Sequence, residues 1–187
     1  MTGAQSTLPN GYAIRPYRRA DAAALAAAEA RAGGLFAAHG FAALAETPPM
    51  EPAIFDTRAR RGDTLVCTHR DDGPVAFAMT GPVGPFLHLM ELSVDPAHGR
   101  RGIGTALLGT VVAKSALDGL AGVSLTTFRD VPFNAPFYAR NGFRPCPPDE
   151  APTPLVERFF REIPPGIDPA TRLIMLRRNS ARSVDGD

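Results

Sequence analysis

A turn rich in glycine and arginine lies near the middle of the chain, between a predicted strand and a predicted helix. Residues 99–104 read Gly-Arg-Arg-Gly-Ile-Gly, and a helical pattern follows over about 102–117. The first N–H groups of a helix have no partner within it and can bind an anion. Glycines let the backbone approach a bulky phosphate, and arginines add charge-assisted hydrogen bonds. The turn therefore predicts a pyrophosphate site.

Two common nucleotide fingerprints do not fit this turn. In the dinucleotide pattern GxGxxG, the third glycine would fall on Leu107. A P-loop needs Gly-Lys-Ser/Thr, whereas the lysine of this helix is Lys114. These failures disfavour a dinucleotide or a nucleoside triphosphate. A glycine turn is also compatible with an ordinary helix start. The residues around it must therefore show whether it binds an anion.

The strand before the turn carries a carboxylate in an apolar setting. Glu91 lies in the nearly continuous apolar run 86–94, where burial on both faces would raise its pKa. Such a group can act as a general base, bind a substrate ammonium, or be only a hydrogen-bonded strand residue. His88 lies three residues before Glu91, so the strand period of two predicts it on the opposite face, in a structural role.

The elements around this site follow from hydrophobic period and turn residues. Asp21 can cap a helix that Gly33-Gly34 ends, and Gly142 can cap a helix over 134–141. Further short helices are expected within 35–50 and 57–62. Strands are expected over 12–17, 64–68, 74–80, 86–94, 123–128 and 173–176. Strands 64–68, 74–80 and 86–94 are expected to form an antiparallel meander. A crossover helix then makes strand 123–128 parallel to strand 86–94. This order predicts an α+β fold with a mixed sheet.

Length and composition limit the classes of protein that this chain can represent. The 187 residues fit one domain, which we expect over 1–178, followed by a polar tail over 179–187. A net charge of +1 argues against binding to nucleic acid or to an anionic membrane. No signal peptide or membrane span is recognisable, and two distant cysteines indicate neither a metal site nor a disulfide framework. We therefore expect a cytoplasmic protein, and the alanine, arginine and proline usage suggests a GC-rich bacterial gene.

Two blocks of sequence resemble the GNAT superfamily of N-acetyltransferases. The first is residues 92–96, Leu-Ser-Val-Asp-Pro, followed by Arg-Gly-Ile-Gly-Thr-Ala-Leu-Leu over 101–108. The second is residues 134–143, which resemble the family's Tyr-x-x-x-Gly-Phe helix end. The resemblance covers about 74–143 well and 12–68 more loosely; beyond 144 only the last strand matches. This chain departs from the family at Gly99, where a glutamine or arginine is usual, and at Val131, where many members have asparagine.

The resemblance implies a fold, a cofactor and an activity. The fold would be a single domain with a mixed, mostly antiparallel sheet of six to seven strands, whose splayed central pair binds coenzyme A. The reaction would be direct attack of an amine on acetyl-CoA through a tetrahedral intermediate, without a metal, with Tyr138 as the acid; Glu91, identified above from its apolar setting, is our candidate for the base. Tyr138 can also be a core tyrosine. The cofactor-binding residues implied are Leu92, Ser93, Val94, Gly99, Arg100, Arg101, Gly102, Ile103, Gly104, Thr105, Asn134 and Phe137.

The acceptor pocket is expected from the first helices and from the segment after the parallel strand. The candidate substrate-binding residues are Glu29, Phe36, Phe128, Arg129 and Phe133, with Phe41 beside them; Arg129 can instead pair with Asp130. These residues suggest a small or amino-acid-like primary amine. An insert over 152–169 carries Leu155, Val156, Phe159 and Phe160 at helical spacing and is expected to close the pocket or to form a homodimer contact.

One rival function belongs to a different class. A protein that keeps the cofactor cleft but has lost turnover would be a non-catalytic acyl-CoA-binding sensor or partner protein. The presence of both Glu91 and Tyr138 favours the enzyme.

Overall fold

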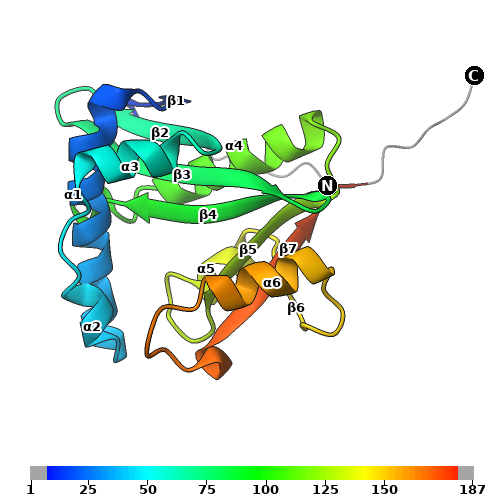
Figure 1. Cartoon of the computed structure of the whole chain (residues 1–187). Helices are drawn as coiled ribbons and strands as arrows, with labels where there is room; N and C mark the ends of the chain where they lie inside the picture. Colours follow the sequence, from blue (N-terminus) through cyan, green and yellow to red (C-terminus); the bar gives the residue numbers. More distant parts are fainter. Residues whose placement is uncertain (1–7, 181–187) are drawn as a thin grey trace, which may run out of the picture.

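One seven-stranded sheet organises the computed structural model, which describes residues 8–180 (Figure 1). The strand order is β1-β2-β3-β4-β5-β7-β6, and every neighbouring pair is antiparallel except β4 and β5. The strands are β1 (Tyr12–Pro16), β2 (Asp63–His69), β3 (Gly73–Val83), β4 (Phe86–Val94), β5 (Gly122–Phe128), β6 (Arg144–Cys146) and β7 (Arg172–Arg178). The α+β class, the mixed sheet, the meander and the parallel pair are as the sequence predicted.

Helices cover both faces of this sheet. One face carries α1, α3 and α6, and the other carries α4 and α5 (Figure 1). The bounds are α1 (Ala22–Gly33), α2 (Ala42–Ala45), α3 (Pro52–Ala59), α4 (Ile103–Leu117), α5 (Ala135–Arg140) and α6 (Thr153–Arg161). Short 3₁₀ turns occupy Arg19–Asp21, Gly34–His39, Pro96–His98 and Pro169–Thr171. No helix among residues 8–180 is long and apolar enough to cross a membrane.

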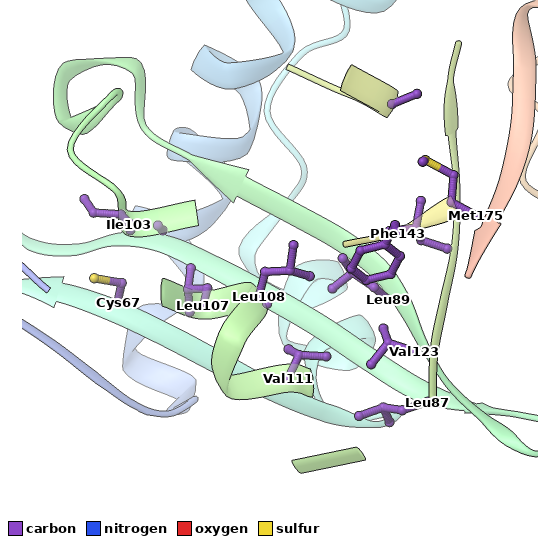
Figure 2. Packing of buried hydrophobic residues seen from close by; sticks show 14 residues of the cluster. Cys67, Leu87, Leu89, Ile103, Leu107, Leu108, Val111, Val123, Phe143 and Met175 are labelled. Atoms are coloured by element: carbon purple, nitrogen blue, oxygen red, sulfur yellow. The ribbon is translucent and has the colours of Figure 1, made fainter. Parts of the chain in front are cut away.

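The largest core cluster fixes α4 against the centre of the sheet. Leu107, Leu108 and Val111 of α4 pack on Leu87 and Leu89 of β4 (Figure 2). All five are at most 4% exposed, and burying a side chain of this size contributes about 1.5–3 kcal/mol. This packing holds the glycine turn at the start of α4 in a fixed position beside β4.

The two central strands pair along only part of their length. The register joins Phe86–Leu89 to Gly122–Leu125, and neither Met90–Val94 nor Thr126–Phe128 has a partner across this gap. The strands diverge beyond that point, as the separation of β4 from β5 in Figure 1 shows. The sheet therefore opens between β4 and β5, which is the splay expected for the central pair.

A bulge in β4 changes which way its second half faces. Leu89 pairs with Thr80 and Glu91 pairs with Met79, so Met90 is an extra residue without a partner on β3. Because a bulge reverses the alternation of side chains, Glu91 faces the same side of the sheet as His88. The prediction that His88 and Glu91 lie on opposite faces is therefore wrong.

Several other elements differ from the sequence prediction. The Asp21 side chain does not cap α1; its carboxylate accepts hydrogen bonds from the Arg15 guanidinium and the Arg18 backbone N–H. Strand β6 was not predicted. Asn179, expected to begin a tail, donates side-chain hydrogen bonds to Ser115 and Leu120. Residues 181–187 of the expected tail lie outside the described residues.

Candidate active site

A cavity of about 1320 Å³ lies where β4 and β5 separate. We call it the central cleft. It is lined by the second half of β4, the first turn of α4, the end of β5, the start of α5 and the C-terminal end of α1. The splay therefore brings together segments that lie on opposite faces of the sheet, and most of the predicted site residues line this space.

The glycine turn presents its backbone to one end of the central cleft. Five of its residues line the cleft, together with the adjacent Thr105: Gly99, Arg100, Gly102, Ile103 and Gly104. None of the described side chains caps the N-terminus of α4, so its first N–H groups remain available to an anion. Arg100 and Gly102 have positive φ values of 60° and 80°, and such alternation makes successive N–H groups converge on an anion.

Space for a side chain is tighter at Gly99 than at Gly104. A Cβ added at Gly99 would lie 3.1 Å from the Pro96 carbonyl oxygen, whereas one at Gly104 would lie 3.4 Å from the Phe137 ring, which is close to ordinary van der Waals contact. The free N–H groups and the side chain of Arg100 are the kinds of donor that a pyrophosphate, such as that of coenzyme A, requires. Leu92, Ser93 and Val94 also line the cleft, along the edge of β4 that β5 leaves unpaired.

Glu91 projects into the central cleft with a perturbed pKa. Its side chain is 32% exposed, and the exposed part faces the cleft. Burial and repulsion from Glu29 raise the pKa of Glu91 to about 7, although Arg58 and the Ser93 hydroxyl oppose the rise. Ser93 donates its hydroxyl hydrogen to Oε1 of Glu91 at 3.0 Å, which orients the carboxylate. A carboxyl group of this kind is suited to proton transfer near neutral pH.

Glu29 and Glu91 share an arginine. The Arg58 guanidinium lies 3.2 Å from Glu29 and 3.9 Å from Glu91. The second carboxylate oxygen of Glu29, Oε2, is buried without a hydrogen-bond partner among the described residues. Because an unsatisfied buried acceptor is costly, the geometry leaves Glu29 able to accept a hydrogen bond from a bound cation.

Tyr138 reaches the central cleft from α5, on the opposite face of the sheet. Burial and the charge of Glu91 raise the pKa of Tyr138 well above its usual range, so its hydroxyl stays protonated and is able to donate a hydrogen bond. Asn134 precedes α5 and donates its amide hydrogen to Thr127 Oγ1 at 2.9 Å, which ties α5 to β5. Phe137 packs on Gly104 and joins α5 to α4.

The predicted aromatic residues gather at the acceptor end of the cleft. The Phe36 ring lies 5.3 Å from Phe128 and 5.1 Å from Phe133, centroid to centroid. Phe41 lies 4.4 Å from Phe128, behind the lining. This cluster gives the cleft an apolar wall next to Glu29.

Two predicted site residues do not line the central cleft. Arg101 donates hydrogen bonds to the Tyr12 hydroxyl and the Ala97 carbonyl. Arg129 is exposed and donates to the Ala170 carbonyl, not to Asp130. Both guanidiniums thus form hydrogen bonds within the protein, and neither residue lines the central cleft.

A second cavity, of about 570 Å³, adjoins the central cleft. We call it the cationic cavity, because it is lined by Arg58, Arg61, Arg158 and Arg172 and by only two carboxylates, Glu91 and Glu162. Met90, Glu91, Thr126 and Arg172 line both cavities. These arginines were not among the predicted site residues. Arg172 has the same sequence signal as Glu91, because it is a charged residue at the start of the apolar strand β7.

The 152–169 insert forms one wall of the cationic cavity. Leu155 and Phe159 of α6 are buried against Phe86, Ile174 and Leu176, whereas Phe160 is 59% exposed. Arg158, Glu162 and Pro164 line the cationic cavity, but no residue of the insert lines the central cleft. The insert thus bounds a pocket beside the expected one. A homodimer contact through it stays a prediction.

Glu162 links this insert to the central strands through buried hydrogen bonds. Its carboxylate lies 3.2 Å from His88 Nε2 and accepts the Thr126 hydroxyl at 2.7 Å, while His88 Nδ1 lies 2.9 Å from Ser124 Oγ. Burial would raise the pKa of Glu162, but His88, Thr126 and Arg158 hold it at about 2. His88 and Ser124 are fully buried, so neither can reach a substrate, and only Glu162 of this Ser-His-Glu chain faces the cationic cavity.

Comparison with known proteins gives a family match over the middle of the chain. Residues 60–145 match a family model described as an acetyltransferase (GNAT) domain. In the described residues, no cluster of three or more His, Cys, Asp or Glu side chains could hold a metal ion.

Solved structures share the fold over most of the chain. A PaiA N-acetyltransferase from Thermoplasma acidophilum in complex with coenzyme A is 15% identical, with a TM-score of 0.64, and the match covers 90% of this chain and 99% of that one. The ribosomal-protein-S18-alanine N-acetyltransferase from Escherichia coli is 19% identical, with a TM-score of 0.64 and coverage of 94% and 99%. A GCN5-related N-acetyltransferase from Rhodopseudomonas palustris is 27% identical, with a TM-score of 0.61 and coverage of 75% and 86%.

Proposed function

We propose that this chain, whose residues 60–145 match an acetyltransferase (GNAT) domain, is a member of the GNAT superfamily and transfers an acetyl group from acetyl-CoA to a primary amine. The observation that carries the proposal is the splay of β4 from β5, which opens a cleft with the glycine turn at one end and Glu91 in its wall. The T. acidophilum protein with the same fold binds coenzyme A.

The residues of the glycine turn would hold the cofactor. The free N–H groups of Ile103, Gly104 and Thr105 would bind the pyrophosphate, with Arg100 adding charge. The unpaired edge of β4 at Leu92–Val94 would hydrogen-bond the pantetheine arm. Acetyl-CoA, when bound, supplies the acetyl thioester that serves as the acyl donor.

Glu91 and Tyr138 would carry the two proton transfers. An aliphatic ammonium has a pKa of about 10.4 and must lose a proton before it can attack. With a pKa of about 7, Glu91 is a better acceptor for that proton than an ordinary carboxylate. Tyr138 keeps its proton because its pKa is raised, so its hydroxyl can donate to the departing sulfur. Glu29, through its unpartnered Oε2, would help to hold the amine in its charged form before transfer.

Calorimetric titration tests the cofactor, and thiol release in the presence of amines tests the transfer. We expect saturable binding of acetyl-CoA and of free CoA, and no binding of NAD or ATP. Absence of CoA binding to folded protein would refute the proposal. CoA binding without transfer to any amine would favour the sensor function instead.

A further inference from the structure

We propose that the acceptor amine also carries a carboxylate, and that the cationic cavity binds this carboxylate through Arg172. This inference rests on the proposed acetyl transfer, because it identifies the class of acceptor that the same site would use. It narrows the acceptor from any primary amine to an amino acid or a similar amino-carboxylic compound.

Arg172 is a buried cation whose nearest carboxylates, Glu162 and Glu91, favour its charge without forming an ion pair with it. Its side chain is part of a residue only 9% exposed, and it forms no ion pair with any residue in the described part of the chain. One terminal nitrogen donates to Thr126 Oγ1 at 3.0 Å, but Nε has no hydrogen-bond partner among residues 8–180. An unpaired buried charge and an unsatisfied donor both cost free energy. A ligand anion beside Arg172 would offset both costs.

The other charges of the cavity are already compensated by protein groups. Arg58 lies between Glu29 and Glu91, and Arg158 pairs with Glu162. The one remaining arginine, Arg61, is exposed and forms no ion pair with a described residue. Counting Arg61, four arginines face three carboxylates, Glu29, Glu91 and Glu162, so the group carries one excess positive charge, which the carboxylate of a ligand would neutralise.

The orientation of Arg172 suits recognition of a planar anion. Its guanidinium carbon lies 4.7 Å from the centre of the Phe128 ring. Stacking on an aromatic ring fixes the plane of a guanidinium while leaving its edge free to form the paired hydrogen bonds that carboxylates accept. The same ring belongs to the aromatic wall of the central cleft.

The cationic cavity is placed for the acceptor and not for the cofactor. Its lining comes from α3, β3, β4, β5, α6 and β7, and includes no residue of the glycine turn at 99–104. It meets the central cleft at Glu91, which is the proposed base. An amine at Glu91 can thus have its carboxylate at Arg172, on the side away from the turn that would hold the pyrophosphate.

Matched acceptors and matched variants test this inference. The common amino acids, β-alanine and γ-aminobutyrate would each be compared with their carboxamides, which keep the amine but lose the charge. Acetyl transfer would be measured by thiol release for the wild type, Arg172→Gln, Arg172→Lys and the exposed control Arg144→Gln. Thermal shift with the same compounds, with and without free CoA, measures binding without requiring turnover.

We expect the preferred acceptor to be one of the amines that carry a carboxylate. Its kcat/KM should be about 10- to 100-fold above that of the matching carboxamide. Arg172→Gln should remove this preference through KM, by lowering transfer to the carboxylate much more than transfer to the carboxamide. Arg172→Lys should retain part of the preference, and Arg144→Gln should retain all of it. A folding defect in Arg172→Gln would lower transfer to both acceptor classes and would appear as weaker CoA binding.

Two results would overturn the inference. One is equal use of carboxylates and carboxamides by the wild type; the other is the absence of any Arg172-dependent stabilisation by the carboxylates. If the carboxylates stabilise the protein through Arg172 but no acetyl group moves, the anion site stands and the proposed transfer fails.

Discussion

Replacing Glu91 with glutamine should make the protein more stable above neutral pH. Burial and Glu29 raise the pKa of Glu91 from 4.5 to about 7 in the folded protein. The folded state therefore binds this proton more tightly than the unfolded chain does, so the associated stability is present below about pH 4.5 and is lost as the pH rises through 7. Glutamine has nearly the same shape and never ionises, so the Glu91→Gln variant avoids this loss.

The magnitude follows from the two pKa values. Each tenfold change in proton affinity is worth about 1.4 kcal/mol, so the full difference sets an upper limit of about 3 kcal/mol. The Glu91 side chain is 32% exposed and has Arg58 at 3.9 Å, and solvent screening at such a site reduces the effect. We expect Glu91→Gln to increase the free energy of unfolding by about 1–2 kcal/mol at pH 8.5 and to leave it unchanged at pH 4.5.

Urea denaturation across this pH range measures the difference directly. Glu46→Gln is a suitable control, because Glu46 is exposed and forms no ion pair with a described residue. The control should follow the wild type at every pH. If Glu91→Gln also follows the wild type from pH 4.5 to 8.5, the pKa of Glu91 is not raised and its assignment as a base loses its physical support. In the transfer assay, Glu91→Gln should lower kcat by about 10²–10⁴-fold.

Three further predictions concern the other parts of the site. Tyr138→Phe should lower kcat by about 10²–10⁴-fold and leave the Kd for CoA unchanged by calorimetry, because the ring still packs while the proton donor is lost; an unchanged kcat would exclude the acid role. Gly102→Ala should destabilise the protein by about 1–2 kcal/mol and weaken CoA binding, because φ is 80° there. The control Gly109→Ala, exposed inside α4 with nothing within 4 Å of an added Cβ, should stabilise it by about 0.5–1 kcal/mol, and equal effects would contradict the argument. Phe159→Ala should lower the free energy of unfolding by about 3–5 kcal/mol in urea, because Phe159 is 5% exposed, whereas Phe160→Ala should change it by less than about 0.5 kcal/mol; similar losses would mean that α6 is not packed as described.

The parts of the site that depend on local sequence were predictable. The glycine turn, the apolar strand around Glu91 and the helix that carries Tyr138 all have patterns that span fewer than about twenty residues, and each forms as expected. Their chemistry follows from residue type and immediate neighbours. The parallel pairing of β4 and β5 also followed, because a crossover helix between two strands leaves few alternatives.

Features set by pairing between distant segments were not predictable. The bulge at Met90 depends on the register of β4 against β3, and it reverses the facing of Glu91 relative to His88. The meeting of Arg58 and Arg172 beside Glu91 depends on how α3 and β7 pack on the sheet. Helical spacing over 155–160 indicated α6, but nothing in that spacing showed that Glu162 would bond to β4 and β5 partners.

The residues proposed for the donor and for the acceptor come from different segments of the chain. The glycine turn, Glu91 and Tyr138 fall within residues 60–145, the segment shared with the family model. Glu29, Arg58, Glu162 and Arg172, which surround the proposed acceptor, lie outside it. Substitutions at these outer positions would leave the residues of the glycine turn unchanged, but those at Glu29, Arg58 and Glu162 would alter the pKa of Glu91. For engineering, Arg172 is therefore the outer position at which to begin a search for new acceptors of the proposed transfer.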